Sequence, residues 1–62
     1  MKLINFLEVA NENTTIKVFN YFTGDLIGLY DGKNSIDSTL NNSDIANISA
    51  HNSVIEIIVI ND

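Results

Sequence analysis

The sequence predicts a small α+β domain in which a short N-terminal helix is followed by a four-stranded antiparallel sheet made of two hairpins. Three observations predict it. Apolar residues recur at spacings of three and four near the N-terminus, which is the helical period. Later segments are rich in β-branched residues and are separated by Gly-, Asp- and Asn-containing turns. A chain of 62 residues allows one domain, which we place at 1–62.

The helix is predicted over about residues 2–10, because its apolar residues fall on one face. These residues are Leu3, Phe6, Leu7 and Ala10. The polar run 11–13 is expected to end the helix, since Asn readily takes the left-handed conformation found at helix ends.

The first hairpin is predicted to join a strand at 14–22 to a strand at 26–30. The turn residues 23–25 are Thr, Gly and Asp, which suits a tight connection. Gly28 lies inside the second strand, where a bulge or a close approach of another segment would account for it. The Asp31-Gly32 pair then indicates another turn.

The second hairpin is predicted to join a strand at 45–50 to a strand at 54–60 through a short connection at 51–53. The segment 33–43 that precedes it is polar and is expected to form a loop or a single helical turn. The last strand is apolar at every position except Glu56, a pattern typical of a strand that is buried on both faces.

This last strand predicts self-association. One helix of nine or ten residues covers one face of a four-stranded sheet, which leaves either Ile55, Ile57 and Val59 or their opposite-parity neighbours uncovered. We expect a homo-oligomer that forms through the sheet, with Ile55, Ile57 and Val59 at the interface. The alternative is that the segment 33–44 folds over that face.

The charge balance excludes several classes of partner. Eight acidic side chains face three basic ones, all Lys, and the net charge is −5. This composition disfavours direct binding to nucleic acid or to an anionic membrane, and favours a protein partner with a basic surface. The sequence has no apolar run long enough to span a bilayer and no Cys, so we expect a cytoplasmic protein of a bacterial host.

No catalytic motif is recognised. His51 and Ser53 form the one His–Ser neighbourhood in the sequence, but a nucleophile also needs an orienting group and an oxyanion site, so we interpret His51 as an exposed turn residue. Three aromatic residues of the first hairpin, Phe19, Tyr21 and Tyr30, suggest a stacking platform for single strands, although packing in a core or an interface suits an acidic chain better.

Three carboxylates in predicted loops are weak candidates for a metal site. Asp25, Asp31 and Asp37 carry the hard oxygen ligands that Mg²⁺ prefers, and oligomer symmetry would bring copies together. The alternative is that they are solvated turn and cap residues. No other cofactor is expected, because the phosphate-binding glycine motifs are absent from the sequence.

The run from Thr23 to Ile36, after the Phe6–Val9 segment and before the Val54–Ile60 strand, resembles short phage and prophage proteins of low-GC Gram-positive gut bacteria. Some proteins of this class are anti-defence factors, including inhibitors of CRISPR nucleases. The resemblance implies a protein-binding inhibitor of a host defence system. The alternatives are an oligomeric, Mg²⁺-dependent DNA-nicking protein and a non-catalytic structural or regulatory module.

Overall fold

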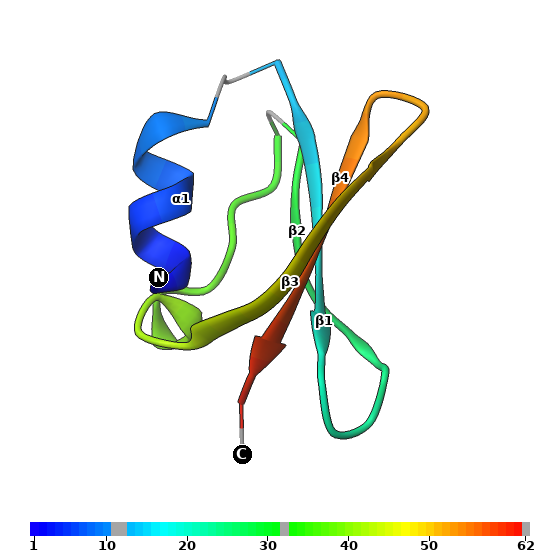
Figure 1. Ribbon diagram of the computed structural model, residues 1–62. Coiled ribbons are helices and arrows are strands. Elements are labelled where there is room, and N and C mark those ends of the chain that lie inside the picture. Colours follow the sequence, from blue (N-terminus) through cyan, green and yellow to red (C-terminus); the bar gives the residue numbers. More distant parts are fainter. Residues whose placement is uncertain (11–12, 32, 62) are drawn as a thin grey trace.

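A computed structural model describes residues 1–10, 13–31 and 33–61. It contains one short helix and a four-stranded sheet, with the helix on one face of the sheet (Figure 1). The elements in chain order are α1 (Leu3–Val9), β1 (Thr15–Asn20), β2 (Leu26–Tyr30), the 3-10 turn η1 (Ser38–Leu40), β3 (Asp44–His51) and β4 (Val54–Ile60). The predicted α+β class is therefore confirmed, and each element begins within a residue or two of its expected position.

The sheet is mixed, which corrects the prediction of a fully antiparallel sheet. Its strand order is β2-β1-β4-β3, and both predicted hairpins are antiparallel. The two hairpins meet at β1 and β4, which run parallel in the register Thr15↔Val54 to Asn20↔Val59. The local pattern of each hairpin carries no information about which strands of the two hairpins become neighbours, so the parallel seam is not predictable from it.

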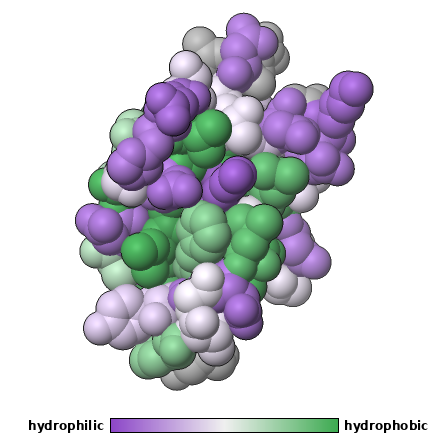
Figure 2. Space-filling view, turned by 90° about the vertical axis from the view of Figure 1, so that its right-hand side faces the viewer, coloured by the Kyte–Doolittle hydropathy of each residue, from purple (hydrophilic) through white to green (hydrophobic). Residues whose placement is uncertain are grey.

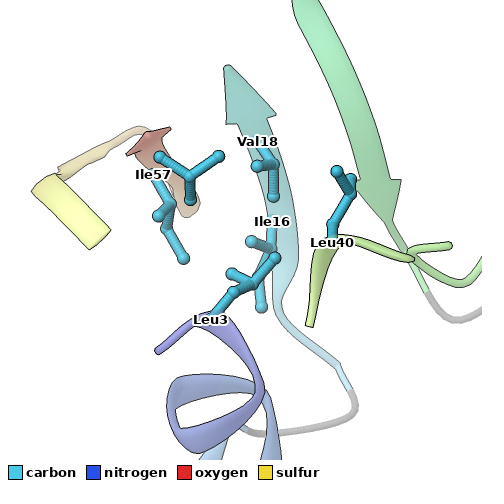
Figure 3. Packing of buried hydrophobic residues seen from close by; sticks show 6 residues of the cluster. Leu3, Ile16, Val18, Leu40 and Ile57 are labelled. Atoms are coloured by element: carbon cyan, nitrogen blue, oxygen red, sulfur yellow. The ribbon is translucent and has the colours of Figure 1, made fainter. Parts of the chain in front are cut away.

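One face of the sheet carries the hydrophobic core, and we call it the covered face. Side chains from α1, β1, η1 and β4 point toward one another there (Figure 3). Because successive strand residues point to opposite faces, Ile16 and Val18 of β1 lie beside Ile55 and Ile57 of β4 on this side. The buried residues of the core are Leu3, Ile16, Val18, Leu40, Ile57 and Val59.

The segment between β2 and β3 lies on the same side as the helix (Figure 1). It forms a single 3-10 turn, one of the two expected forms, and its apolar residues Ile36 and Leu40 pack in or against the core. Gly28 of β2 permits this approach, because a Cβ atom there would lie 3.3 Å from Val18 Cβ and 3.4 Å from Ile36 Cγ2. The helix and this segment together therefore cover this face over β1, β2 and β4, whereas Ile48 of β3, on the same face, is 43% exposed.

Backbone hydrogen bonds fasten the helix to the start of β3. The Leu3 N–H donates to the Ser43 carbonyl at 2.9 Å, and the Ile45 N–H donates to the Met1 carbonyl at 2.9 Å. The Lys2 ammonium lies 2.8 Å from a carboxylate oxygen of Asp44. These contacts hold a seven-residue helix that is too short to be stable alone. The predicted helix stop at Asn11 and Glu12, and the glycine of the Asp31-Gly32 turn, lie outside the described residues.

The turn between β3 and β4 has two residues, Asn52 and Ser53, with positive φ values of 48° and 68°. Two consecutive positive φ values are typical of a type I′ turn, in which Asn-Gly is the preferred pair. We expect Ser53→Gly to stabilise the protein by about 0.5–1 kcal/mol, because glycine adopts positive φ without the steric cost that serine has. Thermal unfolding followed by circular dichroism measures this gain. An unchanged or lower melting temperature would contradict it.

Candidate functional site

The second face of the sheet has no described element over it, and we call it the open face. Successive strand residues point to opposite faces, so the open face carries the strand residues that alternate with those of the core. Among them are Lys17 and Phe19 of β1 and Glu56 and Ile58 of β4. Figure 2, viewed from the side away from α1, shows apolar side chains across its middle, interrupted and bordered by hydrophilic ones. The apolar residues of the open face are Phe19, Leu26, Leu29, Val54, Ile58 and Ile60.

The residues that sequence reasoning placed at an oligomer interface lie on the covered face instead. Ile57 and Val59 are 0% exposed, and Ile55 packs against the same core. They have this position because the helix and the segment 33–43 cover the odd-numbered residues of β4. A partner molecule therefore has access to the opposite-parity residues Val54, Ile58 and Ile60, and the assignment of the three predicted residues moves from the interface to the core.

A hollow of about 430 Å³ opens on the open face, where the β1–β2 turn rises beside the sheet. Two aromatic rings, Phe19 and Tyr21, and the apolar side chain of Ile58 form most of its wall. Ser49 of β3 and Glu56 of β4 supply a hydroxyl and a carboxylate. Asn20 and Gly24 complete the lining. The hollow is therefore apolar and aromatic with one anionic group.

The β1–β2 turn that carries Tyr21 is held by a dense set of hydrogen bonds. The Tyr21 N–H donates to the Val59 carbonyl at 2.9 Å, so its backbone continues the parallel ladder. The Asn20 side-chain amide donates to the Asn61 carbonyl at 2.9 Å, while its oxygen accepts from the Phe22 N–H at 2.9 Å. Gly24 closes the turn with a φ of +77° and an N–H bond of 2.7 Å to the Asn20 carbonyl. These bonds therefore hold the backbone from which the Tyr21 ring projects.

The electrostatic character of the hollow comes from Glu56. Its side chain is 37% exposed, and the residue lies between Lys17 of β1 and Ser49 of β3 in the sheet register. Within the described part of the chain, the one basic side chain in ion-pair range of it is that of His51, whose Nε2 lies 3.8 Å from Oε1. This distance is too long for a hydrogen bond. The carboxylate oxygens therefore keep acceptor capacity toward an incoming group.

The three acidic residues proposed for a metal site lie apart. Asp25 and Asp31 stand at opposite ends of β2, which separates them by about 20 Å of extended chain. The Asp31 carboxylate accepts the Asn34 N–H at 2.9 Å, and this bond lowers its pKa. Asp37 caps the 3-10 turn by accepting the Thr39 N–H at 2.9 Å, with the same effect on its pKa. Among residues 1–10, 13–31 and 33–61, no three His, Asp or Glu side chains gather as a metal group.

The structure does not bring His51 and Ser53 together as a nucleophile–base pair. His51 is the last residue of β3 and is 67% exposed, and its imidazole faces Glu56. Ser53 belongs to the two-residue turn, and within the described chain no hydrogen bond links it to His51. The three aromatic residues also separate, because Phe19 and Tyr21 line the hollow whereas Tyr30 packs against the core.

Sequence reasoning missed the hollow itself. Glu56 was recognised as the one polar position of the last strand, and that interruption was the available signal for a functional side chain. Ser49 gave no signal, because a polar residue in an alternating edge strand is ordinary. Their proximity depends on the β3–β4 register, Ser49↔Glu56, and on the parallel seam that brings Phe19 beside Ile58.

Comparison with known proteins finds no match for this chain among family models, curated proteins or solved structures. No helix in the described residues has the length and apolar character needed to cross a bilayer.

Proposed function

We propose that the protein is a non-catalytic binding module that docks its open face on a basic surface of a larger protein and thereby inhibits it. The observation that carries this proposal is the uncovered sheet face, with six apolar residues on one side of a 62-residue chain. An apolar face of this kind, bordered by polar side chains, is typical of a protein interaction surface. Leu26 is 52% exposed, and the other apolar residues of the open face are half-buried.

The charge of the chain favours a basic partner. Eight acidic side chains against three Lys give a net charge of −5, which attracts a basic surface and repels nucleic acid. Proteins that bind nucleic acid carry such basic surfaces. A small acidic protein that covers one of them competes with the nucleic acid, so an anti-defence inhibitor that blocks a nuclease is the form of this function that we propose.

Two apolar-to-lysine substitutions test whether the partner binds the open face or another surface of the molecule. Leu26→Lys places a cation on the open face, and Val9→Lys places one on α1, where the side chain is 79% exposed. Both positions are exposed, so both variants are expected to fold. Leu26→Lys loses an apolar contact and repels a basic partner, and we expect it to weaken binding at least tenfold, whereas Val9→Lys leaves binding unchanged.

The partner is found by photocrosslinking and is then tested in purified form. A benzophenone side chain at position 21, with position 9 as the control, is crosslinked in extracts of low-GC Gram-positive bacteria. The crosslinked protein is purified and titrated with the wild-type chain and both variants by calorimetry, and its nucleic-acid binding is measured with and without the chain. Equal affinities for the two variants, or a partner without a basic surface, would overturn the proposal. Relaxation of supercoiled plasmid by the chain in Mg²⁺ would overturn its non-catalytic part.

A further inference from the structure

The geometry points to the hollow on the open face as a receptor for one arginine side chain of a protein partner. This inference rests on the proposed function, and it names the group that the open face recognises. The hollow has a volume of about 430 Å³, which is near the lower end of ligand sites. It is also open toward solvent, so a side chain presented by a second surface fits it better than a small molecule that has to be enclosed.

The lining residues match a guanidinium group in shape. Phe19 and Tyr21 present aromatic rings, and the planar guanidinium stacks on such rings by cation–π attraction. Tyr21 is 60% exposed, so its ring is accessible. The Tyr21 N–H bond to the Val59 carbonyl and the Gly24 turn hold the backbone that carries the Tyr21 ring, so little backbone ordering is needed when a side chain enters.

The lining residues also match a guanidinium group in charge. Glu56 supplies the carboxylate of the hollow, and the fork of N–H groups on arginine donates to a carboxylate in a bidentate manner. Ser49 faces Glu56 in the sheet register and adds a hydroxyl acceptor. The basic side chains nearest to Glu56 are Lys17, its neighbour on β1, and His51, whose Nε2 is 3.8 Å from the carboxylate. Neither of them is among the lining residues, so the hollow carries a negative charge without a cation in its wall.

The aliphatic part of an arginine side chain also finds a surface. Ile58 forms the apolar part of the lining, next to Phe19 in the parallel register. The methylene groups of arginine bury against apolar surface while the charged end reaches a polar partner. The hollow therefore offers an apolar surface for the methylene groups and a carboxylate for the charged end of an arginine side chain.

The test titrates the whole protein with N-acetyl-L-arginine amide and follows backbone and side-chain amide resonances by NMR. N-acetyl-L-citrulline amide is the control ligand, because it has the same length and a planar end but no charge. We expect arginine to shift the resonances of Tyr21, Gly24 and Ser49, and citrulline to shift them at least fivefold less at equal concentration. This comparison uses the unaltered protein, so it does not depend on the folding of any variant.

Matched variants then test whether the Glu56 carboxylate and the Tyr21 ring bind the arginine probe. Glu56→Gln is expected to raise the apparent dissociation constant for the arginine probe at least fivefold, whereas Glu8→Gln, an equal loss of charge on the exposed side of α1, leaves it unchanged. Tyr21→Leu is expected to weaken binding of the probe severalfold, and Tyr21→Phe, which keeps the aromatic ring of the lining, is expected to leave it unchanged. The dispersion of the spectrum reports whether each variant is folded.

Three results of the titrations with the arginine probe would overturn the arginine site. They are equal shifts from arginine and citrulline, equal effects of Glu8→Gln and Glu56→Gln, and shifts of the hollow that depend on protein concentration alone, which would show a second copy as the occupant. The proposed function is tested separately, by the effect of Leu26→Lys on partner binding. Leu26 lies outside the hollow, so the two proposals can fail independently. If Leu26→Lys weakens partner binding and Glu56→Gln does not, the open face stands as the docking surface and the arginine site fails.

Discussion

Ile57→Ala is expected to leave the protein largely unfolded at 25 °C. Ile57 is 0% exposed and lies in β4, one of the two inner strands, with Val18 of β1 on one side and Ile48 of β3 on the other. Truncation of a buried isoleucine to alanine costs about 2–5 kcal/mol, because the surrounding groups do not close the cavity. A core of this size supplies about 3–5 kcal/mol in total, so the loss is comparable to the whole stability of the domain.

Urea denaturation followed by circular dichroism measures this effect. The matched control is Ile58→Ala, since it removes the same atoms from the next residue on the same strand, which lies on the open face. Ile58 keeps part of its surface in contact with solvent, so its truncation is expected to cost less than half as much free energy of unfolding. Equal losses at the two positions would contradict the assignment of the covered and open faces.

Gly28→Val is the second substitution with a large expected effect. A Cβ atom at position 28 would lie 3.3 Å from Val18 Cβ and 3.4 Å from both Ile36 Cγ2 and Leu40 Cδ1. Valine adds two further methyl groups to that space, which forces the segment that carries Ile36 and Leu40 away from β2. Overpacking of this kind costs about 1–3 kcal/mol, which corresponds to about 4–8 °C in melting temperature per kcal/mol for a domain of this length.

Thermal unfolding measures the cost of Gly28→Val, and the methyl resonances of Ile36 and Leu40 report where the strain is relieved. Leu29→Val is the control, because it places valine on the neighbouring residue of β2, which points to the open face. It is expected to lower the melting temperature by less than Gly28→Val does. If the methyl resonances of Ile36 and Leu40 are unchanged in Gly28→Val, the close approach of segment 33–43 to β2 is wrong.

The elements of this fold are predictable from the sequence because the residue pattern within each segment is enough to indicate its secondary structure. The helical spacing of Leu3, Phe6 and Leu7 predicts α1, and the run from Val54 to Ile60 predicts β4 to the residue. The pattern of β4 does not predict which face of the sheet becomes covered, because this strand is apolar on both sides. The covered face is decided by the helix and the segment 33–43, because Leu3 and Leu40 are buried in the same core cluster as Ile57.

The candidate site was less predictable than the fold. The acidic residues that the sequence marked, Asp31 and Asp37, accept backbone N–H groups of their own loops, which explains their lowered pKa values without a ligand. The hollow instead joins Tyr21 to Glu56 and Ser49, which lie on three different segments and meet through pairing between hairpins. The residue pattern within one segment does not predict which residues of other segments lie beside it.

The parallel seam between β1 and β4 has a consequence for the order of events in folding. Each hairpin closes over a short stretch of chain, whereas the seam pairs Thr15 with Val54, a separation of 39 positions. Long-range pairings require the larger loss of chain entropy and slow the folding of a protein relative to its local contacts. We therefore expect the two hairpins to form early and the docking of β4 against β1 to limit the folding rate, so that the hollow between them is completed in the last step.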